Sequence, residues 1–275
     1  MNILEFALLV WIGSFIAGFI GSLTGLGGGV VIVPLLTSVF NVDIRYAVGA
    51  SLISVIATSC GASSAYIKEG FTNLRIGMFL EVATTIGALV GALIASFVSV
   101  EALTLMLASV LLYSAYLSQQ PRTEYDQSAP PDPLATYLKL NGTCPTPEGL
   151  MSYQVYSISI GFGVMLIAGL LSGLLGIGSG AFKVLAMDRL MRLPFKVSTT
   201  TSNFMIGVTA TVSVGVYLAR GYIDPGLSMP VMLGVLPGAF LGARVLVGAK
   251  TEVLRNVFSF VLMLMAFKMV YNSLT

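Results

Sequence analysis

The sequence predicts an all-α polytopic membrane protein made of two inverted structural repeats, each with one glycine-broken helix segment and three further spans. Three observations support this fold class. Of the 275 residues, 56% are hydrophobic and only 9% are charged, and the mean hydropathy of +0.92 excludes a soluble domain. Several apolar runs reach the roughly 17–25 residues that cross a bilayer. A glycine-rich motif also occurs once in each half of the chain.

The repeated motif reads Gly21-Ser-Leu-Thr-Gly-Leu-Gly-Gly-Gly29 in the first half and Ser172-Gly-Leu-Leu-Gly-Ile-Gly-Ser-Gly180 in the second. Placing Gly25 over Gly176 gives an offset of 151 residues that holds without a gap over residues 16–92. Seventeen of these 77 positions are identical, and seven of the seventeen are glycines. Because glycine is retained where backbone bends or approaches another group closely, the repeat preserves backbone geometry more than side-chain chemistry.

The surroundings of both motifs argue against a nucleotide-binding loop. Each motif follows about twenty apolar residues (3–22 and 157–175), and neither ends in Gly-Lys-Ser/Thr. The pattern favours a helix interrupted at membrane depth, either re-entrant or discontinuous, whose free backbone groups must lie in protein or line a cavity. Close helix packing through small residues is the alternative. Breaks at matching positions of two halves indicate a transporter site.

The apolar runs give the order of the predicted spans. Two shorter runs, 30–40 and 181–187, follow the glycine motifs and reach only about half the bilayer at ~1.5 Å per residue. The first twenty residues lack a basic leader and recur at the start of the second half, so we expect them to be part of the mature protein. The predicted spans are residues 3–22, 47–67, 76–98, 102–118, 155–175, 200–219, 227–248 and 253–272.

These runs divide the chain into a first membrane repeat (1–119), a polar linker (120–152) and a second repeat (153–275). The proline density of the linker argues against a folded module, although residues 137–140 could form a short ordered piece.

The cationic residues predict the topology. If the broken segments fold back, the two halves have inverted orientations in the membrane. Of the 14 Lys and Arg residues, ten then lie on one side of the membrane and Lys183 lies within it. The remaining three, on the other side, are Arg45, Arg220 and Lys268. If the segments continue in line, the halves are parallel and the cations divide almost evenly. The positive-inside rule therefore favours inverted repeats with a cytoplasmic linker and both termini outside.

Composition also limits the chemistry. The chain has no histidine and only two cysteines, Cys60 and Cys144, and no triad or metal motif. We therefore expect no enzyme activity, no cofactor and no metal site. A net charge of +2 gives no reason to expect nucleic acid as a partner. The expected surroundings are the lipid bilayer, and a homo-oligomer is compatible with the sequence.

Several motifs together resemble one family, over nearly the whole chain. They are Ala17-Gly-Phe-Ile-Gly-Ser-Leu-Thr-Gly-Leu-Gly-Gly-Gly-Val-Val-Ile-Val-Pro34, Gly169-Leu-Leu-Ser-Gly-Leu-Leu-Gly-Ile-Gly-Ser-Gly180 with Lys183, Thr201-Ser-Asn-Phe-Met-Ile-Gly-Val-Thr209, Leu218-Ala-Arg-Gly-Tyr-Ile-Asp-Pro225 and Gly238-Ala-Phe-Leu-Gly-Ala-Arg244. The chain is similar to the TauE/SafE family of sulfite and sulfonate exporters, also called TSUP. This resemblance implies transport of sulfur-containing or other small organic anions across a bacterial membrane.

The glycine breaks and the polar residues near them are candidates for an anion site. Free amides and the positive dipole end at a helix N-terminus favour an anion. Lys183 follows the second break by one turn, and an unpaired ammonium at membrane depth is costly. Lys183 therefore binds an anion, pairs with Asp188 or extends its side chain to the membrane surface. The predicted substrate-binding residues are Thr24, Gly27, Gly28, Gly29, Ser51, Gly178, Ser179, Gly180, Lys183, Ser202 and Asn203.

Glu81 is an acidic residue inside a predicted span, and its repeat equivalent is Met232. Such a carboxylate is a candidate proton-coupling group, and pairing with Arg75 is the structural alternative.

The sequence therefore predicts a secondary transporter of the bacterial cytoplasmic (inner) membrane that moves sulfite or an organosulfonate by alternating access. Thiosulfate, sulfide or another small organic anion are alternative substrates. A non-transporting membrane assembly protein is an alternative of another class, and a cation carrier is disfavoured because the nearest charge to the breaks is Lys183.

Overall fold

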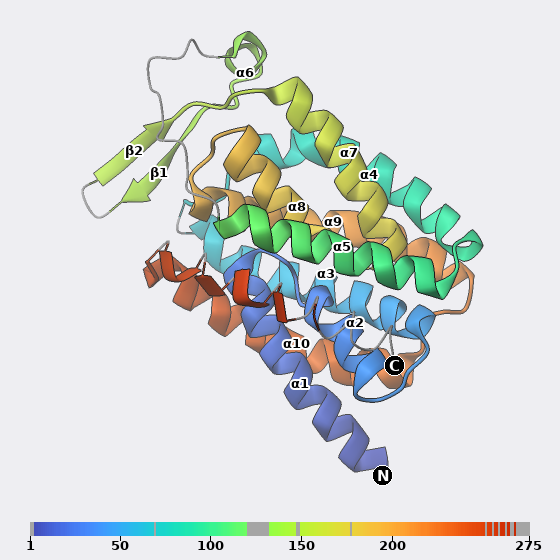
Figure 1. Ribbon diagram of the computed structural model, residues 1–275. Coiled ribbons are helices and arrows are strands. Elements are labelled where there is room, and N and C mark those ends of the chain that lie inside the picture. The colour runs from blue at the N-terminus through green and yellow to red at the C-terminus, as the bar shows by residue number, and fades with distance from the viewer. Residues whose placement is uncertain are drawn as a thin grey trace.

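The computed structural model of the chain describes residues 3–68, 70–119, 132–146, 149–176 and 178–250, with short pieces between 252 and 267. Most of the described residues are helical (Figure 1). The first half contains α1 (Ile3–Thr24), α2 (Gly29–Ser38), α3 (Ile44–Lys68), α4 (Leu74–Ile94), the 3-10 turn η1 (Ala95–Phe97) and α5 (Val100–Gln119). The second half contains α7 (Ile158–Leu175), α8 (Gly180–Leu185), the π-helical turn η2 (Ala186–Leu190), α9 (Phe195–Ala219) and α10 (Pro225–Gly248).

Six helices in the described residues are long and apolar enough to cross a membrane, namely α1, α3, α4, α7, α9 and α10. They coincide with six of the predicted spans, which confirms a polytopic membrane protein. The predicted span at 102–118 lies within α5, and the one at 253–272 falls partly outside the described residues.

The two halves are built from equivalent elements. α2, α3 and α4 begin at Gly29, Ile44 and Leu74, and α8, α9 and α10 begin 151 residues later, at Gly180, Phe195 and Pro225. Equivalent side chains cap α4 and α10, since Asn73 accepts a hydrogen bond from the backbone N–H of Ile76 and Asp224 from that of Gly226. The sequence repeat is therefore also a repeat of helix boundaries.

Equivalent helices exchange their packing partners across the two halves. α1 packs mainly against α10, and α4 against α7, while α3 packs against α9. A Cβ atom at Gly18 would overlap the Val235 carbonyl, and one at the equivalent Gly169 would overlap the equivalent Thr84 carbonyl. Glycine at these crossings allows two helix backbones to touch, as in close helix pairs in membranes.

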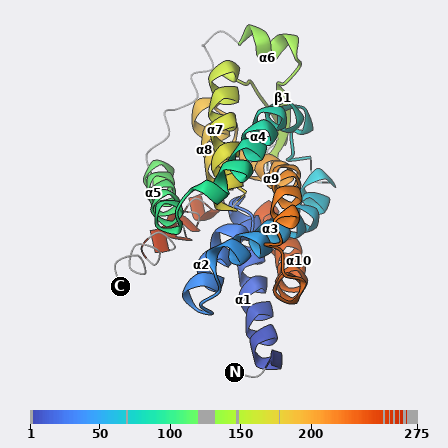
Figure 2. The ribbon, with the colours of Figure 1, turned by 90° about the vertical axis from the view of Figure 1, so that its right-hand side faces the viewer.

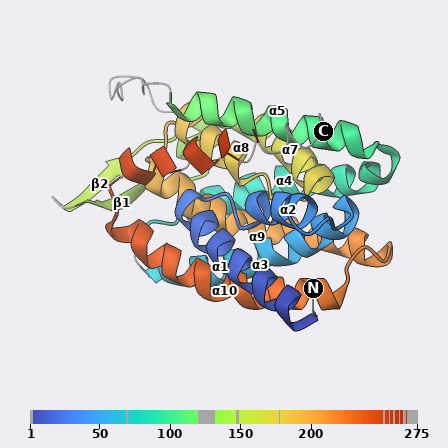
Figure 3. The same ribbon diagram turned by 60° about the horizontal axis from the view of Figure 1, so that its bottom comes forward.

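Both short helices double back toward the start of the preceding long helix. The ring of Phe40, just after α2, lies 5.1 Å from that of Phe6 near the start of α1. In the second half, Met191, just after η2, accepts a 3.2 Å hydrogen bond from the N–H of Tyr156, just before α7. Figures 1 and 3 show α2 running back from the centre of the molecule in this way. The chain therefore reverses its direction at each glycine break.

The segment between the halves is more ordered than the sequence predicts. It holds a short helix, α6 (Pro133–Tyr137), and an antiparallel strand pair, β1 (Gly142–Thr146) and β2 (Gly149–Tyr153), which project from one end of the helices (Figures 1 and 2). The helices that can cross a membrane agree with the predicted all-α membrane protein, whereas the expectation of a linker without a folded module is wrong. Residues 120–131 of the linker lie outside the described residues.

Side-chain contacts explain this order. Asp132 caps α6 by accepting from the N–H of Leu134, and its other carboxylate oxygen accepts from the N–H at the start of α7. Asn73 at the start of α4 donates to the carbonyl of Leu140 and to the hydroxyl of Tyr153, and Arg75 donates to the carbonyl of Lys139. The prolines fit because Pro133 lies in the first turn of α6, where it has no N–H to satisfy.

Candidate functional site

Glycine creates the two breaks because the backbone there is left-handed. The φ angles are +75° at Gly25 and +70° at Gly27, and +67° and +71° at the equivalent Gly176 and Gly178. Such angles are strained for residues with a Cβ atom. Ser179 also has a positive φ, +48°, although it is not glycine.

Two hydrogen bonds hold the breaks against each other, and they are repeat equivalents. Ser51 on α3 donates to the carbonyl of Gly176 at 2.8 Å, and Ser202 on α9 donates to the carbonyl of Gly25 at 2.9 Å. A Cβ atom at Gly180 would overlap the Gly25 carbonyl, so the breaks are also in direct backbone contact. Each half thus supplies a serine that fixes the break of the other half.

Lys183 is fully buried beside these breaks, and its ion partner is Glu81 of the other half. Its Nζ donates to the hydroxyl of Thr209 at 2.5 Å and lies 3.6 Å from Glu81 Oε2, and the Thr209 hydroxyl donates to Glu81 Oε1. Of the alternative partners, Arg75 binds the Lys139 carbonyl. Asp188 pairs with Arg189, whose Nε lies 3.8 Å from Asp188 Oδ2. Lys183 therefore does not extend to the membrane surface.

Among the described residues, the first glycine break has no ion pair beside it that corresponds to Lys183 and Glu81 at the second break. Ile32, Thr58 and Met232 are the counterparts of Lys183, Thr209 and Glu81. Ile32 is fully buried, and the Thr58 hydroxyl instead accepts the N–H of Gly28 at 3.2 Å. The two breaks are similar in backbone and different in chemistry.

Polar atoms without a partner surround the contact between the breaks. The buried atoms with no hydrogen-bond partner in the described structure include Ser179 Oγ, Thr199 Oγ1 and Asn203 Oδ1. Buried polar atoms are normally satisfied, so several of them together indicate a place where water or a polar ligand belongs.

The structure gathers most of the predicted site residues at this contact. Gly29 and Gly180 begin α2 and α8 there, and Asn203 reaches it through a 2.9 Å bond from its Nδ2 to the carbonyl of Ser22. Thr24 differs, because its hydroxyl donates to the carbonyls of Ile20 and Gly21 in its own helix.

Three threonines at the contact were not among the predicted residues: Thr58, Thr199 and Thr209. Thr58 and Thr209 are identical repeat partners, and this identity is the signal that could have selected them.

The fold and this site define a class of protein. Two repeated halves whose broken helices meet at a buried polar centre are the architecture of a multi-pass membrane transporter. The chain belongs to the TauE/SafE family, since the family model described as "Sulfite exporter TauE/SafE" matches residues 10–269.

Relatives agree with this assignment. The probable membrane transporter protein YunE of Bacillus subtilis (strain 168) is 28% identical over 279 residues, which cover 98% of this chain and 99% of that protein. The probable membrane transporter protein YdhB of the same organism is 26% identical, over 86% of this chain and 89% of that protein. No solved structure matches the chain. The protein is thus a membrane transporter of the cell membrane and not an enzyme.

Proposed function

We propose that this transporter moves a small sulfur-containing anion, sulfite or an organosulfonate, by alternating access around the contact between the two glycine breaks. The family description names sulfite export, and the names of the relatives leave the substrate open. The observation that carries the proposal is the burial of Lys183 beside the breaks.

Lys183 gives the centre its anion preference. A buried ammonium in a membrane protein is costly unless a partner is present, and here Glu81 and Thr209 are its partners. A sulfite or sulfonate group offers the same negatively charged oxygens as the Glu81 carboxylate. An incoming anion can therefore replace Glu81 at Lys183 without leaving the ammonium unpaired, and the unpartnered Ser179 Oγ supplies a further donor.

Exchange of partners at Lys183 couples the anion to a proton. When the anion binds Lys183, Glu81 is left buried without a cation, and a buried charge without a partner is costly. Glu81 then takes up a proton as the anion binds, and releases it when the ion pair re-forms. Lys183 and Glu81 belong to opposite halves, so the same exchange loosens the contact between them.

Inverted repeats fit this cycle. They are supported by the re-entrant short helices, by the exchange of packing partners and by Figure 1, in which α1 and α7 run in opposite directions. Arg45 and Arg220 lie at one end of the helices, and Arg75 and Lys139 lie near the strand pair at the other. By the positive-inside rule the end with the strand pair is cytoplasmic.

The test is transport by purified protein in liposomes. Uptake of radiolabelled sulfite, taurine and sulfoacetate is compared with thiosulfate, sulfide and a cation such as sodium. We expect saturable sulfite or sulfonate uptake, and we expect Lys183→Met to weaken the binding of that anion by about 1–3 kcal/mol, as for loss of a charge-assisted hydrogen bond. Transport of thiosulfate or sulfide alone would show that the substrate is a different sulfur anion from the one proposed. Transport of none of these compounds would favour a role in membrane assembly.

A further inference from the structure

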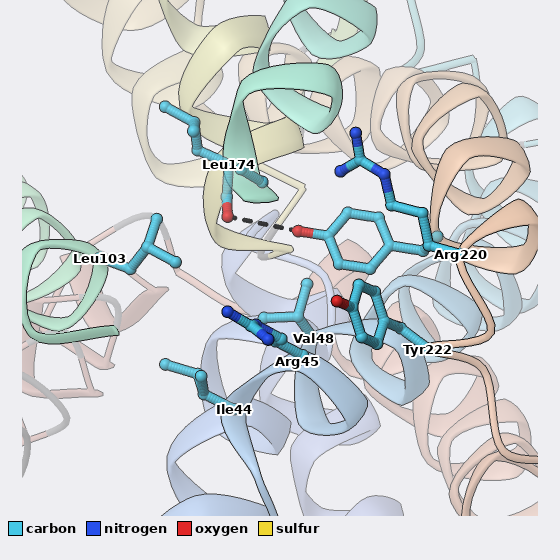
Figure 4. Close-up of a pocket in the computed structure, with 9 residues that line it drawn as sticks. Ile44, Arg45, Val48, Leu103, Leu174, Arg220 and Tyr222 are labelled. Carbon is cyan, nitrogen blue, oxygen red and sulfur yellow. Dashed lines mark hydrogen bonds between the residues drawn. The ribbon is translucent and has the colours of Figure 1, made fainter. Parts of the chain in front are cut away.

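A recess opens at the end of the helices away from the strand pair (Figure 4). It is small and open to the outside. α3 supplies Arg45 and Val48 to its wall, and the region around the end of α9 supplies Tyr217, Arg220 and Tyr222. Two cations and two phenols therefore line a wall that is otherwise apolar.

The two arginines have different roles. Arg220 is held in place, since its guanidinium donates to the carbonyls of Ala92 and Leu93 at the end of α4 at 2.9 and 3.1 Å. The guanidinium of Arg45 lies 5.7 Å from the centre of the Tyr222 ring, and it makes no ion pair with any residue that the structure describes. Figure 4 shows the two arginines on either side of Tyr222. Arg45 is thus the cation with free donors.

The floor of the recess lies directly on the second glycine break. Val48 lines the recess and also packs against Gly176, where an added Cβ atom would overlap it. The hydroxyl of Tyr217 donates to the carbonyls of Gly173 and Leu174 at 3.4 and 3.5 Å. One layer of side chains therefore separates the recess from the contact between the breaks.

The opposite end of the helices has a repeat-equivalent arrangement. Lys196 is the counterpart of Arg45, and Phe71 is the counterpart of Tyr222. The Nζ of Lys196 lies 5.6 Å from the centre of the Phe71 ring, and the counterpart of Val48, Thr199, packs against Gly25 as Val48 packs against Gly176. Each break thus has a cation above an aromatic ring on its outer side.

The two arrangements are closed to different degrees. Phe71 is buried, with 7% of its surface exposed, and Lys196 donates to the carbonyl of Val247 at 2.9 Å. Arg45 is exposed, and Tyr222 is only half-buried. The end with the recess is therefore the more open one.

We propose that Arg45, Tyr217 and Tyr222 form an access site that binds the transported anion on the recess side, and that Lys196 and Phe71 form its counterpart on the strand-pair side. This inference rests on the proposed function. A guanidinium with free donors and the phenol of Tyr222 bind the oxygens of a sulfite or sulfonate group, and the aromatic ring must move for the anion to pass to the break. Because repeat-equivalent groups are at both ends, opening one access site and closing the other gives alternating access.

The test measures uptake of radiolabelled sulfite from each side separately, in right-side-out and inside-out membrane vesicles. Arg45→Gln should raise the half-saturating sulfite concentration on the order of ten-fold for sulfite presented on the recess side, and leave it unchanged from the strand-pair side. Arg45→Lys should restore most of the affinity. Lys196→Gln should have the reverse sidedness. Arg75→Gln, which removes an exposed cation that donates to the Lys139 carbonyl, is the matched control and should change neither side.

The results separate this proposal from the proposed function. If wild-type vesicles transport sulfite but Arg45→Gln leaves the half-saturating concentration unchanged from both sides, or raises it equally from both, the access site is refuted and the central site stands. If wild-type vesicles transport neither sulfite nor a sulfonate from either side, the proposed function fails, and the access site fails with it.

Discussion

The Nζ of Lys183 lies 3.6 Å from Oε2 of Glu81, and this ion pair joins the two halves of the protein. Lys183 is on α8 in the second half, and Glu81 is on α4 in the first. The hydroxyl of Thr209 bridges the two groups, and both charged side chains are shielded from solvent. A ligand that competes for Lys183 therefore acts on the interface between the halves as well as on the local charge.

The first prediction concerns the stability that this ion pair provides. Lys183→Met leaves Glu81 buried beside Thr209 without a cation, and loss of one partner of a buried pair typically costs about 3–5 kcal/mol. We expect a lower melting temperature for Lys183→Met in detergent, measured by scanning fluorimetry. Lys183→Met combined with Glu81→Gln should recover most of the loss, because no buried charge remains. A double variant that melts as low as Lys183→Met would show that the pair is not the cause.

The second prediction concerns coupling. Glu81→Gln keeps the size and polarity of the side chain but cannot exchange a proton at pH 7. We expect it to retain exchange of labelled for unlabelled substrate in liposomes and to lose accumulation driven by a pH gradient. Glu101→Gln, on the exposed first turn of α5, is the matched control and should remain coupled. Accumulation by Glu81→Gln at the wild-type level under a pH gradient would assign Glu81 a structural role only.

The repeat in the sequence explains how much of this centre could be predicted. The offset that places Gly25 over Gly176 also places Ser51 over Ser202, so two equivalent breaks with a serine near each follow from the sequence alone. Both serines indeed lie at the contact, where each binds the break of the other half. The breaks can be predicted from the repeated glycines because the backbone conformation at a break depends mainly on the local sequence.

The pairing of Lys183 with Glu81 could not be read in this way. Their repeat counterparts, Ile32 and Met232, are apolar, so the repeat gives no sign that the two positions face each other. Which residues meet across two helices depends on the rotation and depth of each helix, and the apolar residues around Glu81 on α4 and around Lys183 on α8 leave both undetermined. The ordered linker escaped prediction for another reason, since its contacts to Asn73 and Arg75 come from a distant part of the chain.

The third prediction tests the backbone contact between the breaks. An alanine Cβ at Gly180 would overlap the carbonyl of Gly25, which is already fixed by Ser202. Gly180→Ala should separate the two breaks and cost roughly 1–3 kcal/mol, as overpacking does elsewhere. Gly215→Ala on α9 has open space around the added methyl group and is the matched control. Melting temperature and sulfite uptake should both fall for Gly180→Ala alone, and equal behaviour of the two variants would contradict the observed contact.

The last prediction concerns topology, and the structure decides which residues can report it. The native Cys144 lies on β1 with 3% of its surface exposed, and burial raises the pKa of its thiol above the ordinary value. Because the thiolate is the reactive form, Cys144 should react slowly with maleimides from either side at neutral pH. Better reporters are Leu150 on β2, with 76% of its surface exposed, and Val39 at the end of α2, with 51%.

We therefore expect opposite labelling of two single-cysteine variants, Leu150→Cys and Val39→Cys, made in a background that carries Cys60→Ser and Cys144→Ser. A membrane-impermeant maleimide added to intact cells should label Val39→Cys, because α2 returns to the end of the molecule where α1 begins. It should label Leu150→Cys only after the membrane is permeabilised, since the cations near the strand pair favour the cytoplasmic side. Labelling of both variants in intact cells would refute the inverted arrangement. Labelling of Leu150→Cys alone would show that the protein has the opposite orientation in the membrane, with the strand pair outside.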